Sequence, residues 1–256
     1  MEIIVLNGSP KGEQGITLQY IRFLQKKYPM HNFRILHIAQ RIKRLERDGT
    51  AFSEVLAEIR GADLVLWATP VYYLLVPSQY KRFIELVDER GGAEAFAGRY
   101  AAALTTSIHF YDHTAHNYLA GISEDWRMRY YGGYSAEMMD LQRPEDREQL
   151  LHFADGLFAA VAQGAPVPQS YVPVVPHNLT YTPGPSDGAH RPALALNPGR
   201  ALQALIISDG LDRSPNLERM VTRLAASFDW PVEVVDLTAM DIKAGCQGWS
   251  TVRPGQ

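Results

Sequence analysis

Up to about residue 165, short apolar runs alternate with segments whose apolar residues recur at helical spacing, and this alternation restricts the fold to few architectures. Strands alternating with helices form a parallel sheet with helices on both faces, and right-handed crossovers leave few strand orders. We therefore predict a doubly wound α/β domain over residues 1–164, with a five-stranded parallel sheet of order 2-1-3-4-5. The predicted strands are residues 3–6, 33–38, 63–68, 100–105 and 128–134, and the predicted helices are residues 17–28, 52–60, 78–90, 113–124 and 145–162.

The rest of the chain divides into a connector and an incomplete second unit. Residues 165–200 hold eight of the sixteen prolines and show no period, which predicts an extended, semi-rigid linker. In residues 201–256 the run Ala204–Gly210 resembles Ile3–Gly8 and is followed by a helical and a strand-like segment. This is a weak internal repeat, and it predicts a partial strand–helix–strand copy of the first unit.

Composition excludes several classes of protein. The net charge is −3, and the cations between Arg41 and Arg47 are interrupted by apolar and acidic residues, so no nucleic-acid footprint is predicted. The single cysteine, Cys246, excludes an intrachain disulfide and a cluster held by four thiolates. The N-terminal apolar run lacks a basic flank and is too short for a signal or a membrane span. We expect a cytoplasmic protein without a membrane partner.

The loop between the first predicted strand and helix, residues 8–17, has the composition of an anion site. Its glycines let the backbone approach an anion closely, Ser9 and Thr17 add hydroxyl groups, and Thr17 is also predicted to cap the helix. The helix N-terminus would add free N–H groups and partial positive charge. The spacing of the glycines in this loop fits neither a Walker A motif nor a Gly-x-Gly-x-x-Gly motif. The composition of the loop therefore predicts a phosphate-binding site. The alternative is that the loop is a turn that only connects the strand to the helix.

A second loop, residues 68–83, follows the third predicted strand and carries aromatic and apolar residues, including Tyr72 and Tyr73. In a 2-1-3-4-5 sheet the chain direction switches between the first and third strands, so both loops face one crevice. A phosphate cradle beside an aromatic surface suits a flat ring system with a phosphate tail. The alternative is that both tyrosines are ordinary packing residues.

These two loops resemble the NADPH-dependent FMN reductase and iron–sulfur flavoprotein group of the flavodoxin-like superfamily. The resemblance is carried by Asn-Gly-Ser-Pro-Lys at residues 7–11 with Thr17, and by Pro-Val-Tyr at 70–72 followed by Pro-Ser-Gln-x-Lys-x-Phe at 77–83. It implies FMN contacts in three groups: Ser9, Lys11, Gly15, Ile16 and Thr17 at the phosphate; Pro70, Val71, Tyr72 and Tyr73 along the ribityl chain and ring; and Thr106, Ser107, Ile108 and His109 at another ring edge.

The resemblance also implies an activity. A flavin carries the hydride chemistry itself, so no catalytic acid or base is required, and none is predicted. We expect an FMN-dependent oxidoreductase that takes electrons from NADPH or NADH and passes them to a quinone, a flavin or a protein, working as a homodimer or homotetramer. The alternatives are a non-enzymatic FMN electron carrier and a flavodoxin-like association domain without cofactor.

The second copy lacks the features that would make it functional in the same way. Asp209 and Asp212 place carboxylates where an anion would lie, so no second flavin is expected. Residues 241–248 resemble the segment in which iron–sulfur flavoproteins begin their cysteine cluster, but Trp249 stands where a second cysteine is expected. No iron–sulfur cluster is therefore predicted.

Three histidines, His109, His113 and His116, fall at helical i, i+4 and i+7 spacing. One hypothesis is a metal site, with a metal hydrolase as the corresponding function. A second is a role beside the flavin, steering the electron donor or acceptor, and a third is loop packing and helix capping.

Overall fold

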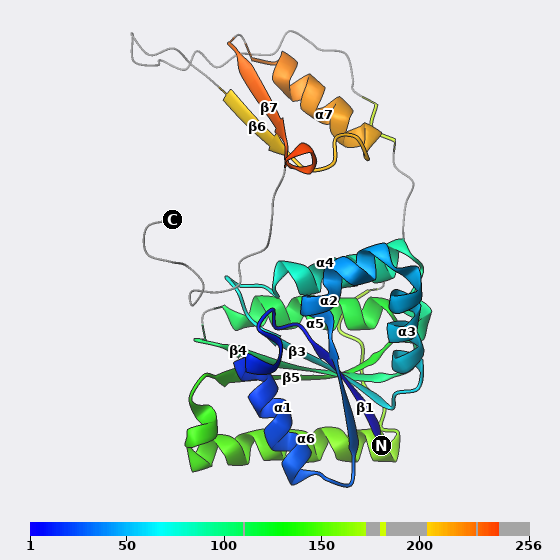
Figure 1. Ribbon diagram of the computed structural model, residues 1–256, viewed down its shortest axis with the longest axis vertical. Helices are drawn as coiled ribbons and strands as arrows, with labels where there is room; N and C mark the ends of the chain where they lie inside the picture. Colours follow the sequence, from blue (N-terminus) through cyan, green and yellow to red (C-terminus); the bar gives the residue numbers. More distant parts are fainter. Residues whose placement is uncertain (110, 173–179, 183–203, 229, 241–256) are drawn as a thin grey trace. The chain divides into compact units, whose positions relative to one another are not determined.

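A computed structural model describes residues 1–109, 111–172, 180–182, 204–228 and 230–240 (Figure 1). The chain divides into two compact units, with the boundary after Val174. Residues 173–179 and 183–200 of the predicted Pro-rich linker, and the segment around Cys246, lie outside the described residues.

The first unit is built on a five-stranded parallel sheet of order β2-β1-β3-β4-β5, as predicted. Its strands are β1 (Glu2–Asn7), β2 (Asn32–His37), β3 (Leu64–Pro70), β4 (Tyr100–Ser107) and β5 (Arg129–Glu137). Its helices are α1 (Ile16–Lys27), α2 (Ile38–Arg47), α3 (Gly49–Arg60), α4 (Ser78–Glu89), α5 (Asp112–Asp125) and α6 (Pro144–Gln163).

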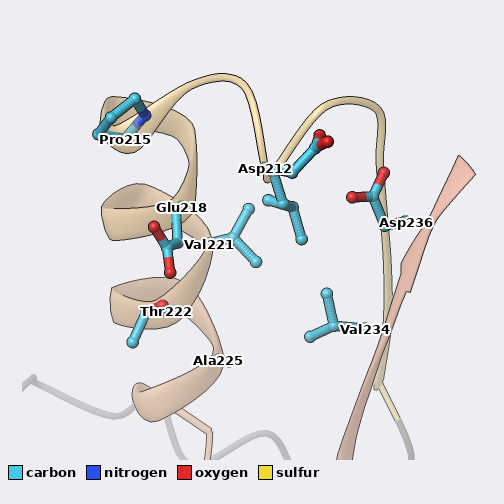
Figure 2. A pocket seen from close by; sticks show the side chains of 9 residues that line it. Asp212, Pro215, Glu218, Val221, Thr222, Ala225, Val234 and Asp236 are labelled. Carbon is cyan, nitrogen blue, oxygen red and sulfur yellow. The ribbon is translucent and has the colours of Figure 1, made fainter. Parts of the chain in front are cut away.

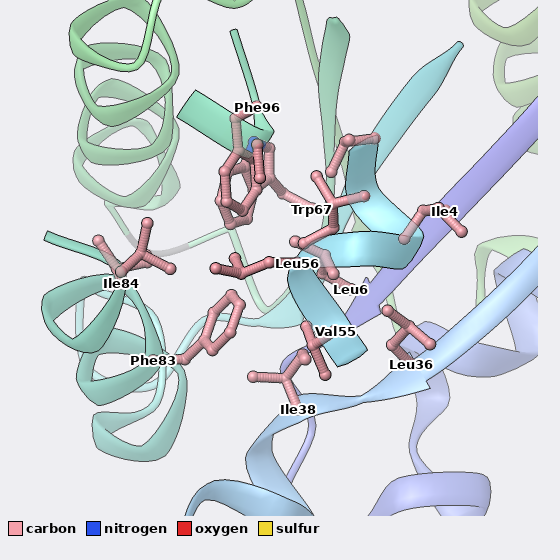
Figure 3. Packing of buried hydrophobic residues seen from close by; sticks show 14 of the residues in the cluster. Ile4, Leu6, Leu36, Ile38, Val55, Leu56, Trp67, Phe83, Ile84 and Phe96 are labelled. Atoms are coloured by element: carbon pink, nitrogen blue, oxygen red, sulfur yellow. The ribbon is translucent and has the colours of Figure 1, made fainter. Parts of the chain in front are cut away.

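Helices cover both faces of this sheet: α1 and α6 lie on one side, and α2 to α5 on the other (Figure 1). Alternate residues of β1 enter opposite cores, Ile3 and Val5 on the α1 side and Ile4 and Leu6 on the other. All four side chains are at most 4% exposed, which explains why a central parallel strand is an unbroken apolar run. The larger core is shown in Figure 3, where Trp67 lies beside Phe96.

Three local features differ from the sequence-based expectations. Residues 38–47, which are not among the predicted helices, form α2, because Ile38, Ile42 and Leu45 pack into the core. β5 continues three residues past Tyr134, to Glu137. The predicted cap at Thr17 is wrong: α1 begins at Ile16 with Gly15 as N-cap, and Thr17 lies inside the helix.

The first unit includes residues beyond α6. The carbonyl of Ala165 accepts a hydrogen bond from the Tyr100 hydroxyl (2.5 Å), and the buried Glu124 carboxylate accepts the N–H groups of Ser170 and Tyr171 (2.9 and 2.6 Å). The start of the Pro-rich segment is therefore fixed to this unit.

The second unit contains β6 (Ala204–Ser208), α7 (Pro215–Ala226) and β7 (Val232–Asp236), the strand–helix–strand order expected from the weak repeat. β6 and β7 pair in parallel. The hydroxyl of Ser214 caps α7 by accepting the N–H of Leu217. In the part of the chain that is described, no helix combines the length and apolarity needed to cross a bilayer.

Candidate active site

A cavity of about 570 Å³ lies at the carboxyl edge of the sheet, where the loops after β1, β3, β4 and β5 meet. Its volume falls in the usual range of small-molecule sites. Its lining combines every residue predicted from the sequence except His109, together with Met138, which was not predicted: Ser9, Lys11, Gly15, Ile16, Thr17, Pro70, Val71, Tyr72, Tyr73, Thr106, Ser107, Ile108 and Met138.

The loop after β1 is held by hydrogen bonds between its own side chains and backbone. Asn7, almost fully buried, accepts the N–H of Ser9 (3.0 Å), and Ser9 Oγ accepts the N–H of Lys11 (3.3 Å). A Cβ atom on Gly15 would lie 2.6 Å from Ser9 Oγ, so only glycine permits this close approach. The turn also holds Gly12 at φ +55°, in the left-handed region.

This end of the cavity fits an anion. No side chain caps the N-terminus of α1, so its first N–H groups stay open at the cavity wall formed by Gly15, Ile16 and Thr17. The partial positive charge of the helix end and the exposed Lys11 favour negative charge there. The hydroxyl of Thr17, freed from capping, pairs with Thr106 Oγ1 at 2.6 Å and joins this wall to β4.

The loop after β3 supplies the apolar part of the cavity. Tyr72 and Leu75 exchange backbone hydrogen bonds in a tight turn, which places Tyr73 and Leu74 in the left-handed region at φ 48° and 76°. Tyr73 is 91% exposed at the rim. The N–H of Val71 donates to the carbonyl of Thr106 (2.9 Å), so the loops after β3 and β4 are directly connected.

The first turn of α5 holds the loop after β4 and also contacts the loop after β3. Asp112 Oδ2 accepts from Ser107 Oγ (2.6 Å) and from His109 Nδ1 (3.1 Å), while Thr114 Oγ1 donates to the carbonyl of Leu74. His109 adopts φ 58° and bonds to Asp112 instead of lining the cavity. Burial opposes ionisation of Asp112, but hydrogen bonds from Ser107, Ser135 and His109 lower its pKa below the ordinary value.

Sequence reasoning missed Met138, Asp112 and Thr114. Met138 was missed because the fifth strand was expected to end at Tyr134, so its loop was not placed at the sheet edge. Asp112 bonds to the loop after β4 and Thr114 to the loop after β3. The sequence signal for both was their position at the start of the helix predicted over residues 113–124.

The three histidines do not converge. His109 bonds to Asp112, His113 lies near the ring of Tyr111, and His116 is paired through Nε2 with Thr105 Oγ1 (2.9 Å). Burial lowers the pKa of His116 below its ordinary value. Within the described residues no group of three His, Cys, Asp or Glu side chains is arranged to hold a metal ion.

The second unit has a cavity of about 610 Å³ between α7 and β7 (Figure 2). Its lining includes the carboxylates of Asp212, Glu218 and Asp236, and Asp236 Oδ1 accepts the N–H of Gly210 (3.2 Å). This concentration of negative charge disfavours a phosphate, unlike the corresponding loop of the first unit.

The parallel sheet of order 2-1-3-4-5, with a glycine-rich loop and an aromatic loop at its switch point, defines a flavodoxin-like fold. A family model described as NADPH-dependent FMN reductase matches residues 1–138, and the chain belongs to this family. By this membership it is an NAD(P)H-dependent, FMN-containing reductase. The cation and open helix N-terminus at one end of the cavity and the apolar loop at the other fit such a cofactor.

A solved structure with a TM-score above 0.5 supports the fold. An apo NADH:FMN oxidoreductase (EMOB) is 17% identical with a TM-score of 0.52, and the match covers 62% of this chain and 89% of that one. General stress protein 14 from Treponema denticola, solved with FMN, is 15% identical (TM-score 0.47; 62% and 98% covered). FerB from Paracoccus denitrificans, an NAD(P)H:(acceptor) oxidoreductase, is 18% identical (TM-score 0.48; 63% and 97%). Among curated proteins, none matches this chain significantly.

Proposed function

We propose that the cavity holds FMN with its phosphate at the loop after β1 and its ring between the loops after β3 and β4. The observation that carries this proposal is the convergence of two loops, about sixty residues apart in sequence, on one cavity. Ser9, Lys11, Gly15, Ile16 and Thr17 would hold the phosphate through backbone N–H groups, hydroxyls and one cation. Pro70–Tyr73 and Thr106–Ile108 would enclose the ring, and His109 supports that loop from outside.

In this proposal the protein binds and orients, and the cofactor reacts. Bound FMN supplies the two-electron chemistry between the nicotinamide donor and the acceptor. The residues of the cavity wall keep water from part of the ring, and the hydrogen bonds of Val71 and Thr114 hold the loops in place. No side chain of the lining needs to take or give a proton in the hydride step.

The acceptor that best fits the rim is a small planar molecule, such as a quinone or a free flavin. Tyr73 and Ile108, which are 91% and 79% exposed, lie at the cavity together with Met138, and none of the described residues that line it carries a carboxylate. An electron carrier that docks on a protein partner usually surrounds its cofactor with charge to steer that partner. The apolar rim favours a reductase of small molecules over such a carrier.

Binding and turnover test this function separately. Apoprotein titrated with FMN should quench flavin fluorescence at a one-to-one ratio, and riboflavin, which lacks the phosphate, should bind more weakly. The loaded protein should oxidise NADPH or NADH faster with a soluble quinone or free flavin than with a protein acceptor. FMN that washes off completely, or NAD(P)H oxidation no faster than with free FMN, contradicts the proposal.

Two further expectations remain proposals. A homodimer or homotetramer is supported by exposed large apolar side chains, Tyr111 and Met139 among them, and light scattering of the loaded protein tests it. The division into a flavin domain, a Pro-rich linker and a partial repeat is supported by the separate β6–α7–β7 unit. Limited proteolysis should cleave within the predicted linker, residues 165–200, if that division is correct. The cytoplasmic location stays a prediction.

A further inference from the structure

The carboxylate of Asp112 collects hydrogen bonds from side chains at the edge of the cavity. Its Oδ2 atom accepts from Ser107 Oγ (2.6 Å), Ser135 Oγ (2.5 Å) and His109 Nδ1 (3.1 Å). Asp112 is buried, and these donors keep it ionised at neutral pH. An ionised carboxylate can only accept hydrogen bonds, so the hydroxyl protons of both serines are directed at Asp112.

The hydrogen bond to Asp112 determines whether Ser107 can donate a hydrogen bond to a ligand or accept one from it. A serine hydroxyl has one proton and two lone pairs. The proton of Ser107 is given to Asp112, and one lone pair accepts the N–H of His109 at 2.8 Å. Ser107 lines the cavity, so one lone pair remains for the ligand. Ser107 can accept a hydrogen bond from the ligand but cannot donate one.

Two other hydroxyls of the cavity, those of Thr17 and Thr106, can donate a hydrogen bond to a ligand. Thr17 and Thr106 are paired at 2.6 Å, and either oxygen can be the donor. Whichever donates, the second hydroxyl keeps its proton free for a ligand oxygen such as that of a phosphate. The cavity therefore offers a proton donor at the Thr17–Thr106 pair and an acceptor at Ser107.

We propose that Ser107 is a specificity-determining residue that accepts a hydrogen bond from an N–H group of the ring system bound in the cavity. The inference rests on the proposed function. Two ligands of such a reductase carry a suitable group: the imide N–H of the flavin ring and the carboxamide of the nicotinamide donor. Ligands that present a carbonyl at this edge are disfavoured, because two acceptors would then face each other.

The flavin arm of the test measures binding without turnover. Wild-type and Ser107→Ala apoproteins are titrated with FMN and with FMN methylated at the imide nitrogen. Since a neutral hydrogen bond contributes modestly, methylation should weaken wild-type binding about 3- to 10-fold more than it weakens binding to Ser107→Ala. Ser107→Cys, whose thiol is a weak acceptor, provides a second variant if the alanine protein does not fold.

Ser135→Ala is the matched control. Ser135 donates to the same oxygen of Asp112 but does not line the cavity, so this variant should discriminate between the two flavins as the wild type does. The donor arm compares KM for NADPH with KM for the analogue in which an acetyl group replaces the carboxamide. Here too the ratio should fall about 3- to 10-fold in Ser107→Ala and stay unchanged in Ser135→Ala.

The outcomes separate this inference from the function on which it rests. Coupling in the flavin arm or in the donor arm supports it and identifies which N–H group Ser107 accepts. Tight FMN binding without coupling in either arm overturns the role of Ser107 and leaves the proposed function standing. A wild-type protein that does not bind FMN at all overturns both.

Discussion

Replacing Gly15 with alanine places a methyl group where the structure has no room for one. The new Cβ would lie 2.6 Å from Ser9 Oγ and 3.0 Å from Ser9 Cβ, well inside contact distance. Gly15 has φ −69° and ψ 136°, which alanine also adopts, so the effect comes from this contact and not from backbone strain. Ser9 must therefore move, and its hydrogen bond with the N–H of Lys11 is lost.

The magnitude follows from these contacts. Losing the hydrogen bond costs about 1 kcal/mol, and alanine is a poorer N-cap than glycine, so the total destabilisation should be about 1–2 kcal/mol. In a unit of this size that lowers Tm by roughly 3–8 °C. Because Ser9 and the first turn of α1 form the phosphate end of the cavity, FMN affinity should fall about 10-fold, whereas riboflavin affinity should change little.

The assay is thermal unfolding of the apoprotein together with fluorescence titration of FMN and riboflavin. Gly121→Ala is the control: Gly121 lies within α5, nothing lies within 4 Å of its added Cβ, and alanine in a helix interior should raise stability by about 0.5–1 kcal/mol with FMN affinity unchanged. If Gly15→Ala binds FMN as the wild type does, or loses FMN and riboflavin equally, the assignment of this loop to the phosphate is refuted.

Three further predictions follow from single side chains. Lys11→Met should weaken FMN about 5- to 30-fold and leave riboflavin unchanged, because the lost contact is with the phosphate; equal losses in the titration would contradict this. Tyr73→Ala should raise KM for a quinone about 3- to 10-fold at unchanged Tm, since Tyr73 is 91% exposed at the rim; an unchanged KM would remove it from the acceptor site. Burial holds the pKa of the His116 imidazole below 6.5, so the imidazole takes up a proton less readily in the folded state than in the unfolded state. The stability that the neutral imidazole contributes is therefore complete above pH 6.5 and is lost as the pH falls through the folded-state pKa. Urea midpoints should therefore fall less between about pH 7 and about pH 5 in His116→Gln than in the wild type, and parallel curves would argue against burial of a neutral imidazole.

Sequence periodicity was sufficient for the architecture of the first unit. The unbroken apolar runs of β1 and β3 predicted buried parallel strands, and the helical stripes between them predicted the crossovers, which the sheet order confirms. Element boundaries were less well predicted. Thr17 has the composition of a cap, but composition does not reveal that its hydroxyl meets Thr106, 89 residues away.

The sequence by itself determined which loops meet, because strand order places the carboxyl ends of β1, β3 and β4 at one edge, and the residues of these loops line the cavity. Only the tertiary structure decided what individual side chains do there. His109 belongs to the loop predicted to contact the cofactor, but its side chain bonds to Asp112 and does not line the cavity. Met138 enters because β5 extends further than its apolar pattern. Periodicity reports which face of an element is buried, whereas hydrogen-bond partners depend on distances between atoms far apart along the chain.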